Sequence, residues 1–256
     1  MSESARLIYM SEVFSAIQGE GSFVGERQVF VRLAGCNIRC AYCDQPEALE
    51  KVAGPCRLET TAGRRDWAIA DSPIPIDMVA DAVDRLAGDV RHHSVSLTGG
   101  EPLFQGARLA RLAALLAGRG HRLHLETNGM LALALVQVGR YLSHVSMDLK
   151  LPSVDGENVD LGRHRRFLAT AMRLGNDVAC KIVIGPCTDA DELAAAVSMV
   201  TQTAPRAVVF LQPVTPFAGV TGSPGPERVL ELQAMALELH ERVRVVPQTH
   251  KAIGQL

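Results

Sequence analysis

The chain has 256 residues, of which 47% are hydrophobic and 21% are charged, and its formal net charge is -2. This composition provides for one sizeable hydrophobic core, and the charge leaves no basic surface of the kind that binds nucleic acid. No apolar run approaches the roughly 18 residues of a membrane span, and the first residues lack the pattern of a signal peptide. We therefore expect a cytoplasmic protein whose thiols stay reduced.

Short apolar, β-branched runs alternate along the chain with amphipathic segments of helical length. The predicted strands are residues 29–33, 94–98, 122–127, 144–150, 178–184, 207–212 and 242–246. The predicted helices are residues 76–88, 106–118, 130–139, 164–175, 189–203 and 226–241, several of them ending at a glycine that we expect to act as a C-cap, namely Gly88, Gly118, Gly139 and Gly175. This alternation is typical of parallel βαβ units and predicts an α/β fold, either a doubly wound sheet or a barrel.

Two regions interrupt the alternation within what we expect to be a single domain over residues 1–256. Residues 44–75 contain CRLETTAGRRDWAIA, which predicts an inserted hairpin around Ala62 and Gly63. Residues 213–226 form a loop rich in proline and glycine that leaves the end of a predicted strand.

Candidate functional residues follow five of the predicted strands. They are Cys36, Gly99 to Glu101, Glu126 to Asn128, Asp148 to Lys150, and Gln212. Because chemistry in parallel α/β proteins takes place at the carboxyl ends of the strands, we expect these residues to meet at one face.

Three cysteines lie within eight positions of the segment GCNIRCAYCDQPEA, at Cys36, Cys40 and Cys43. Disulfides between such close neighbours would close strained, very short loops. A structural zinc site needs four ligands, and Cys56 would have to supply the fourth. An iron–sulfur cluster held by three thiolates would instead leave one iron free for another ligand. The residues alone leave zinc and the cluster open.

The C-x3-C-x2-C spacing, with Tyr42 before the last cysteine, resembles that of the radical S-adenosylmethionine (SAM) enzymes. The segment Leu97 to Pro102, LTGGEP, is similar to the GGEP motif of that superfamily, in which glycines let the backbone approach the cofactor and carbonyls accept from its ammonium group. Alone, this segment would be read as an ordinary turn. The resemblance implies a partial (β/α)6-type barrel with a mostly parallel sheet, a 4Fe-4S cluster and bound SAM.

Further segments resemble the 7-carboxy-7-deazaguanine synthase family from about residue 9 onward. They are FSAIQGEGSFVGERQVFVRLAGC (14–36), ETNG (126–129), DLKLPS (148–153) and QTHKAIG (248–254). This resemblance implies a carbon–nitrogen lyase that contracts 6-carboxy-5,6,7,8-tetrahydropterin to 7-carboxy-7-deazaguanine with loss of ammonia, in queuosine and deazapurine biosynthesis. Two alternatives stay open: an activase that places a glycyl radical on a partner protein, and a non-catalytic binding protein stabilised by zinc or a cluster. The QGEG and HK segments argue against the activase.

The pterin edge is rich in donors that the Glu20 carboxylate can accept, and the substrate carboxylate suits the guanidinium of Arg32. An internal salt bridge of Arg32 is the alternative. By resemblance, the substrate pocket comprises Gln18, Gly19, Glu20, Arg32, Thr98 and His250. The residues implied for SAM are Tyr42, Gly100, Glu126, Thr127, Asp148, Lys150 and Gln212.

One position departs from the family pattern, in which Cys-Asp-Thr supplies a threonine oxygen to magnesium. This chain has Gln45 after Cys43 and Asp44, so magnesium would bind through Gln45, through Asp44, or not at all. The resemblance also implies a flavodoxin- or ferredoxin-like electron donor and a homodimer. The other cysteines, Cys56, Cys180 and Cys187, show no cluster spacing.

Overall fold

The computed structural model describes residues 6–156, 160–217 and 220–255, so the extent of the domain predicted over residues 1–256 stays a prediction. Its main strands are β2 (Met10–Ile17), β3 (Arg27–Leu33), β4 (Gly54–Glu59), β5 (Trp67–Ser72), β7 (Ser94–Gly99), β8 (Leu123–Thr127), β9 (His144–Leu149), β10 (Asp177–Ile184), β11 (Val208–Pro213) and β12 (Val243–Val245). They form one ten-stranded sheet in the order β12-β11-β10-β9-β8-β7-β3-β2-β4-β5. A separate antiparallel pair joins β1 (Leu7–Ile8) to β6 (Ile74–Pro75).

In the part of the sheet that runs β3-β7-β8-β9-β10-β11-β12, every pair of adjacent strands is parallel, whereas β2 pairs with β3 antiparallel. The connecting helices are α1 (Ile76–Asp89), α2 (Gly106–Gly118), α3 (Ala132–Val138), α4 (Pro152–Asp155), α5 (Leu161–Arg173), α6 (Ala190–Thr203) and α7 (Pro226–Leu239), and α8 (Thr249–Ala252) lies near the C-terminus. Short 3-10 turns are η2 (Gly21–Phe23), η3 (Pro46–Ala48), η4 (Pro102–Gln105) and η5 (Gly139–Tyr141). The predicted α/β fold with a mostly parallel sheet is confirmed.

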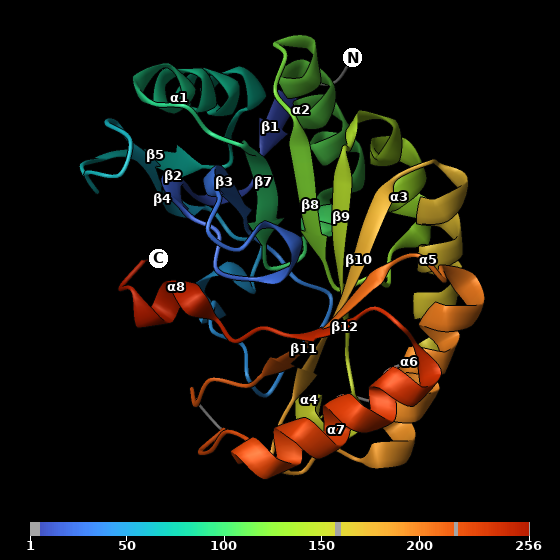
Figure 1. The fold of residues 1–256 in the computed structure, drawn as a ribbon. Coiled ribbons are helices and arrows are strands. Elements are labelled where there is room, and N and C mark those ends of the chain that lie inside the picture. Colours follow the sequence, from blue (N-terminus) through green and yellow to red (C-terminus); the bar gives the residue numbers. More distant parts are fainter. Residues whose placement is uncertain (1–5, 157–159, 218–219, 256) are drawn as a thin grey trace.

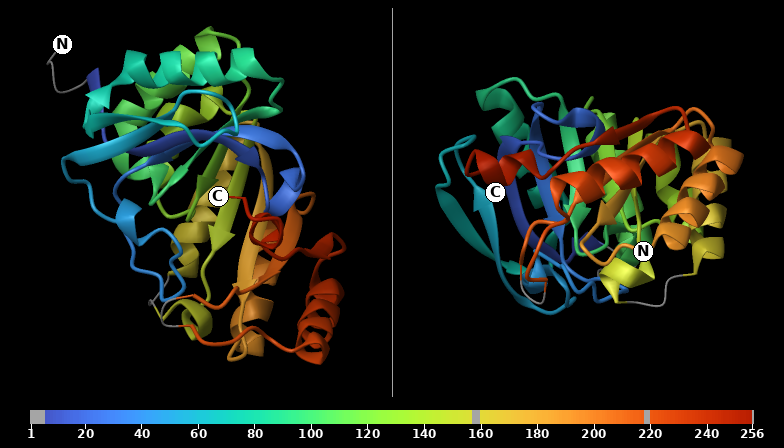
Figure 2. Two further views of the ribbon diagram at one scale, coloured as in Figure 1. Left: turned by 90° about the vertical axis from the view of Figure 1, so that its left-hand side faces the viewer. Right: turned by 60° about the horizontal axis from the view of Figure 1, so that its bottom comes forward.

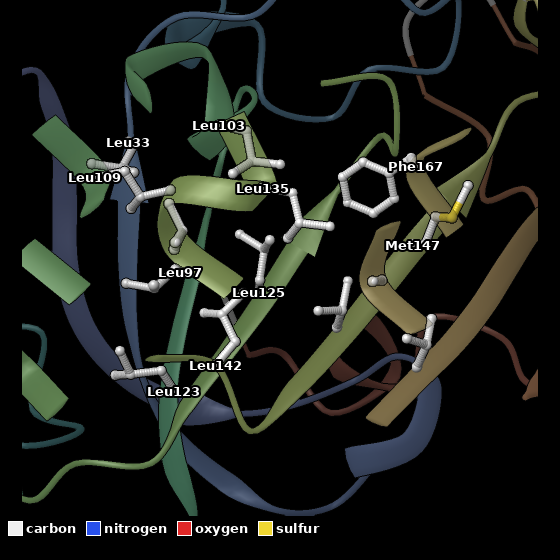
Figure 3. Packing of buried hydrophobic residues seen from close by; sticks show 14 of the residues in the cluster. Leu33, Leu97, Leu103, Leu109, Leu123, Leu125, Leu135, Leu142, Met147 and Phe167 are labelled. Carbon is white, nitrogen blue, oxygen red and sulfur yellow. The ribbon is translucent and has the colours of Figure 1, made fainter. Parts of the chain in front are cut away.

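The helices bury apolar stripes against the outer face of the curved sheet (Figures 1 and 2). Helix α2, for example, buries Leu109, Leu112 and Leu116, at the spacing that one helical face requires. Figure 3 shows Leu97 and Leu125 from the sheet packed near Leu135 of α3 and Phe167 of α5, all of them fully buried. This core fixes the strand positions, and the strands in turn position the loops at their ends.

Residues 44–75 contain the hairpin β4–β5, whose connecting segment places Gly63 at φ +78°. Strand β4 pairs with β2, a strand that the sequence did not reveal, and so the hairpin extends the sheet at its edge. Two of the four expected glycine caps are wrong, because α1 and α2 include Gly88 and Gly118. Gly139 is the C-cap residue of α3, as expected, and it also begins η5. Only Gly175 takes the left-handed conformation expected of a cap, at φ +76°.

The amino ends of the central strands are closed by a cluster of rings. The ring of Phe23, from η2, lies 4.5 Å from that of His93, 5.0 Å from that of His124 and 4.6 Å from that of His144. The carboxyl ends of the strands therefore remain as the place for a pocket. No helix of the described residues is long and apolar enough to cross a membrane.

Candidate active site

A pocket lies where the carboxyl ends of the parallel strands meet the cysteine loop and the C-terminal segment. All the site residues that the sequence predicted line it: the four expected metal ligands, the seven cofactor residues and the six substrate residues. The structure thus brings the whole predicted set together. Which ligand each residue binds stays a prediction.

The glycine-rich segment lies directly against the end of β3. Gly99 has φ +131°, and a Cβ atom there would stand 2.1 Å from the carbonyl oxygen of Leu33. A Cβ atom on Gly100 would stand 2.6 Å from the carbonyl oxygen of Gly35. Only glycine permits this contact, which brings the segment beside Cys36.

Glu101 connects the glycine-rich segment to the loop after β8. The sequence placed it among the candidate residues at the strand ends but assigned it no ligand. Its carboxylate is fully buried and accepts hydrogen bonds from Leu103 N, from Thr127 Oγ1 and from Asn128 N. Burial raises the pKa of Glu101 to about 7, although these donors oppose the shift. Asn128 Nδ2 then donates to Asn37 Oδ1 at 2.8 Å, which ties this loop to the cysteine loop.

Glu126 is the acceptor at the centre of a second network. Its carboxylate accepts from Gln18 Nε2 at 2.6 Å, from Ser96 Oγ at 2.8 Å and from Thr98 Oγ1 at 2.9 Å. The sequence assigned Glu126 to the cofactor and Gln18 and Thr98 to the substrate. The structure places all three in one hydrogen-bonded group.

Lysine and carboxylate side chains alternate across the pocket. Lys181 Nζ lies 2.5 Å from Glu20 Oε2 and 3.4 Å from Asp148 Oδ2, and Lys150 Nζ lies 2.8 Å from the same Asp148 oxygen. Lys150 Nζ also donates to Tyr42 Oη at 3.1 Å. Burial alone would raise the pKa of Asp148, but the two ammonium groups outweigh burial and lower it. Asp148 therefore stays ionised.

The C-terminal segment docks on the QGEG loop. The backbone N–H of Thr249 donates to Gly19 O at 3.0 Å, and a Cβ atom on Gly19 would stand 2.1 Å from His250 Nδ1. Gln248 Nε2 donates to Glu20 Oε1 at 2.7 Å, a contact that sequence reasoning missed. Position 19 therefore needs a glycine, because any side chain there would collide with His250.

Two further ion pairs bear on the sequence predictions. Arg32 Nε lies 2.8 Å from Glu12 Oε1, so the internal salt bridge that was the alternative for Arg32 is present. This pair uses only Nε and leaves the terminal guanidinium nitrogens for another acceptor in the pocket. Lys251 Nζ lies 3.1 Å from Asp44 Oδ2, next to the unusual Gln45.

The described residues show no group of three or more His, Cys, Asp or Glu side chains set around a single metal ion. Cys36, Cys40 and Cys43 nevertheless line one pocket. Cys56, the proposed fourth zinc ligand, is instead fully buried in the hydrophobic core. The structure thus provides three thiols in the pocket without the fourth that a zinc site needs.

Comparison with known proteins identifies this arrangement. The radical SAM superfamily matches residues 31–184. The 7-carboxy-7-deazaguanine synthase of Geobacter sulfurreducens is 40% identical over 250 residues, which cover 96% of this chain and 97% of the relative. This chain belongs to the 7-carboxy-7-deazaguanine synthase family. The synthase of Methanothermobacter thermautotrophicus is 32% identical over 95% of this chain and 96% of its own length.

Solved structures support the fold of this synthase family member. QueE from Escherichia coli covers 94% of both chains with a TM-score of 0.62 at 21% identity. SuiB from Streptococcus suis bound to S-adenosylmethionine has a TM-score of 0.56 at 15% identity over 83% of this chain and 48% of SuiB. At these identities the likeness concerns the fold alone.

Membership of the superfamily implies a 4Fe-4S cluster and SAM, and the synthase pocket fits both. Burial raises the pKa of the Cys36 and Cys40 thiols, and the positive charge of a bound metal centre would favour their ionisation. Among the described residues, Asp148 Oδ1 and Gln212 Oε1 are buried acceptors without a hydrogen-bond partner. Both residues line the pocket, where a ligand rich in donors, such as SAM, would satisfy them.

Proposed function

We propose that the protein is a radical SAM carbon–nitrogen lyase that converts 6-carboxy-5,6,7,8-tetrahydropterin to 7-carboxy-7-deazaguanine, with loss of ammonia, in queuosine and deazapurine biosynthesis. The observation that carries this proposal is the full-length identity of 40% to a named synthase, in a chain whose matching segments line one pocket. No observation favours a glycyl-radical activase or a binding protein.

In this proposal Cys36, Cys40 and Cys43 hold the 4Fe-4S cluster through their thiolates. Cluster and SAM, when bound, supply the radical chemistry that removes a hydrogen atom from the substrate. The protein orients the reactants and excludes water. Asp148 Oδ1 and Gln212 Oε1 accept hydrogen bonds from SAM, because both are buried acceptors in need of donors.

The pterin binds beside Glu126, Gln18 and Glu20. Glu126 belongs with the substrate residues, since Gln18 and Thr98 both donate to its carboxylate. The carboxylates accept from the N–H groups of the pterin edge, and the terminal nitrogens of Arg32 bind the substrate carboxylate. Half-buried His250 completes this side of the pocket.

Magnesium, where it takes part, binds through the side-chain oxygen of Gln45. Asp44 is already engaged by Lys251 at 3.1 Å and by Gln248 at 3.2 Å. Burial favours a higher pKa for Asp44, but Lys251 and the hydrogen bonds lower it, so its charge is already compensated. Gln45 lines the pocket beside it and supplies the hard oxygen ligand that magnesium prefers.

The proposal includes a flavodoxin- or ferredoxin-like protein as electron donor, a homodimer as the working assembly, and a cytoplasmic location where the thiols stay reduced. The donor is required because the cluster needs one electron for each cleavage of SAM. All six cysteines of the chain are free, as such a location requires.

Anaerobically reconstituted protein, incubated with dithionite, SAM and 6-carboxytetrahydropterin, tests the function. We expect 7-carboxy-7-deazaguanine by mass spectrometry, and none from a Cys40→Ala control. If 5′-deoxyadenosine forms without the deazapurine, the proposed substrate is wrong and the superfamily assignment stands.

A further inference from the structure

Two cations and two aromatic rings form a cluster on the outer side of the cysteine loop. We call Tyr9, Lys51, Phe104 and Arg108 the basic patch. Lys51 Nζ lies 4.8 Å from the ring centroid of Phe104 and 6.0 Å from that of Tyr9, while Arg108 Cζ lies 5.7 Å from Tyr9. Within the described part of the chain, neither cation forms an ion pair with a carboxylate.

The basic patch lies directly behind the first cluster ligand. A Cβ atom on Gly35, the residue before Cys36, would stand 3.0 Å from Lys51 Cβ and 3.1 Å from Phe104 Cδ1. The Phe104 side chain is 41% exposed. None of the four patch residues lines the active-site pocket. The cysteine loop is thus the layer between the pocket and this surface.

An apolar depression continues the surface from Phe104 toward α3 and α5. Met130, Leu131 and Leu133 line it together with Phe104, and Leu133 is 86% exposed. Its rim carries Arg163, Arg166 and Arg173. Of these three, Arg166 alone is seen near a carboxylate within the described residues, with its Nη2 atom 3.6 Å from Asp160. Apolar centre and basic rim are therefore continuous with the basic patch.

We propose that the basic patch and the adjoining depression dock a small acidic one-electron carrier protein. This inference rests on the proposed function, because the cluster held by Cys36 requires one electron per reaction cycle. The reduced flavin or iron–sulfur centre of the carrier loses that electron and the cluster gains it, with no atom transferred. An acidic carrier suits a locally basic face on a chain whose formal net charge is -2, since such complementarity steers encounter.

The exposed apolar side chains suit the same partner. Interfaces commonly place aromatic and aliphatic residues at a desolvated centre and charges at the rim, as Phe104 and Leu133 are placed here. A second copy of this chain, docked about a two-fold axis, would bring like-charged arginines together. The charges therefore favour an acidic partner over self-association.

The test compares two charge-reversed variants of the reconstituted holoenzyme. Lys51→Glu/Arg108→Glu alters the basic patch. Arg85→Glu/Arg244→Glu is the control, since it changes net charge equally at exposed positions in α1 and β12. Reduced flavodoxin serves as the probe, and stopped-flow absorbance follows cluster reduction at low and high salt. Dithionite-driven turnover checks that each variant is folded and loaded.

We expect the patch variant to lose about tenfold or more in the rate of cluster reduction by flavodoxin at low salt, together with much of the salt dependence. Its dithionite-driven turnover should match wild type, and the control should keep both rates. An unchanged rate with flavodoxin, or an equal loss in the control, overturns the proposal. So does a patch variant that turns from dimer to monomer in sedimentation while flavodoxin still reduces it.

Cluster reduction is read before any pterin reacts, which separates the two proposals. A protein that accepts electrons through the patch without forming a deazapurine would refute the proposed function and leave the docking surface in place.

Discussion

Lys181 neutralises two carboxylates at once, one expected to face substrate and one expected to face SAM. Its ammonium lies 2.5 Å from Glu20 and 3.4 Å from Asp148, and burial of the group is outweighed by these charges, which raise its pKa. Removal of the cation leaves two half-buried carboxylates each short of one partner. We propose that Lys181 positions both ligands by holding the two carboxylates in place.

Lys181→Met is therefore expected to lower kcat/KM on the order of 10²-fold, because breaking half-buried ion pairs misplaces both carboxylates. It should also reduce the cooperativity between SAM binding and pterin binding, which calorimetry of the holoenzyme measures directly. Lys181→Arg keeps the charge and should recover part of both. If Lys181→Met keeps the wild-type cooperativity between SAM and pterin, then Lys181 has only a structural role.

His124 is held in its neutral form inside the barrel. Nδ1 faces the Gln28 side-chain Nε2 at 3.4 Å, so the ring proton resides on Nε2, which contacts Ser146 Oγ at 2.8 Å. Burial, followed by the nearby His144, keeps the pKa of His124 well below 6.5. A second proton on Nδ1 would face the Gln28 amide donor at 3.4 Å, whereas the Glu126 carboxylate lies farther away, at 4.0 Å.

Because the pKa of His124 is depressed in the folded state, its contribution to stability is complete above pH 6.5 and is lost as pH falls below that value. One proton contributes about 1.4 kcal/mol per pH unit, so up to about 2 kcal/mol should be lost between pH 6.5 and pH 5. Urea unfolding at the two pH values should show His124→Asn less acid-sensitive than wild type. Equal acid sensitivity would assign the effect to other groups.

Among the elements, the loop after β2 and the C-terminal segment form one unit because Gly19 has no side chain. A methyl group there would collide with the backbone nitrogen of His250 at 2.5 Å. Gly19→Ala should push α8 from the pocket, lower kcat/KM about tenfold or more and speed hydrogen exchange over residues 246–255. Gly118→Ala is the matched control, since a Cβ atom there meets nothing within 4 Å. Unchanged exchange in Gly19→Ala would refute the docking role.

Some elements could be predicted from the sequence and others could not, for physical reasons. The parallel strands β3 and β7 to β11 are mostly buried and form short apolar runs, so their positions followed from local pattern. Strand β2 was missed because its polar residues are neutralised by distant ones: buried Glu12 pairs with Arg32 and with Arg57 of β4. Such pairing depends on register between strands, which no local window contains.

The same limit applies to the site. Motif residues such as Cys36 and Glu126 were predicted because family segments mark them. Lys181 was missed as a site residue, although a lysine inside the apolar run VACKIVI is an unusual signal. Glu101 stands in the motif itself, yet its role as the acceptor that joins two loops is visible only in three dimensions.

At the scale of the whole molecule, the hydrophobic core is continuous without Cys36, Cys40 or Cys43. The parallel strand pairs from β3 to β12 are likewise held by backbone hydrogen bonds that do not involve the cysteine loop. The cysteine loop is joined to this body by separate hydrogen bonds, such as Ala41 N to Asp155 O at 3.1 Å and Asn128 Nδ2 to Asn37 Oδ1 at 2.8 Å. The cluster therefore serves the chemistry and contributes little to folding, unlike the metal of a zinc finger.

Removal of the cluster by anaerobic chelation should consequently leave far-UV circular dichroism unchanged and thermal unfolding cooperative, with a melting shift of a few degrees, or roughly 1 kcal/mol. Hydrogen exchange should increase over residues 36–50 and stay slow in β7 to β10, because their amides are paired within the buried sheet. The Cys40→Ala protein, which cannot hold the cluster, should show the same exchange pattern without chelation. Global unfolding of either sample would make the cluster a structural centre and revive the reading of this chain as a metal-stabilised binding protein.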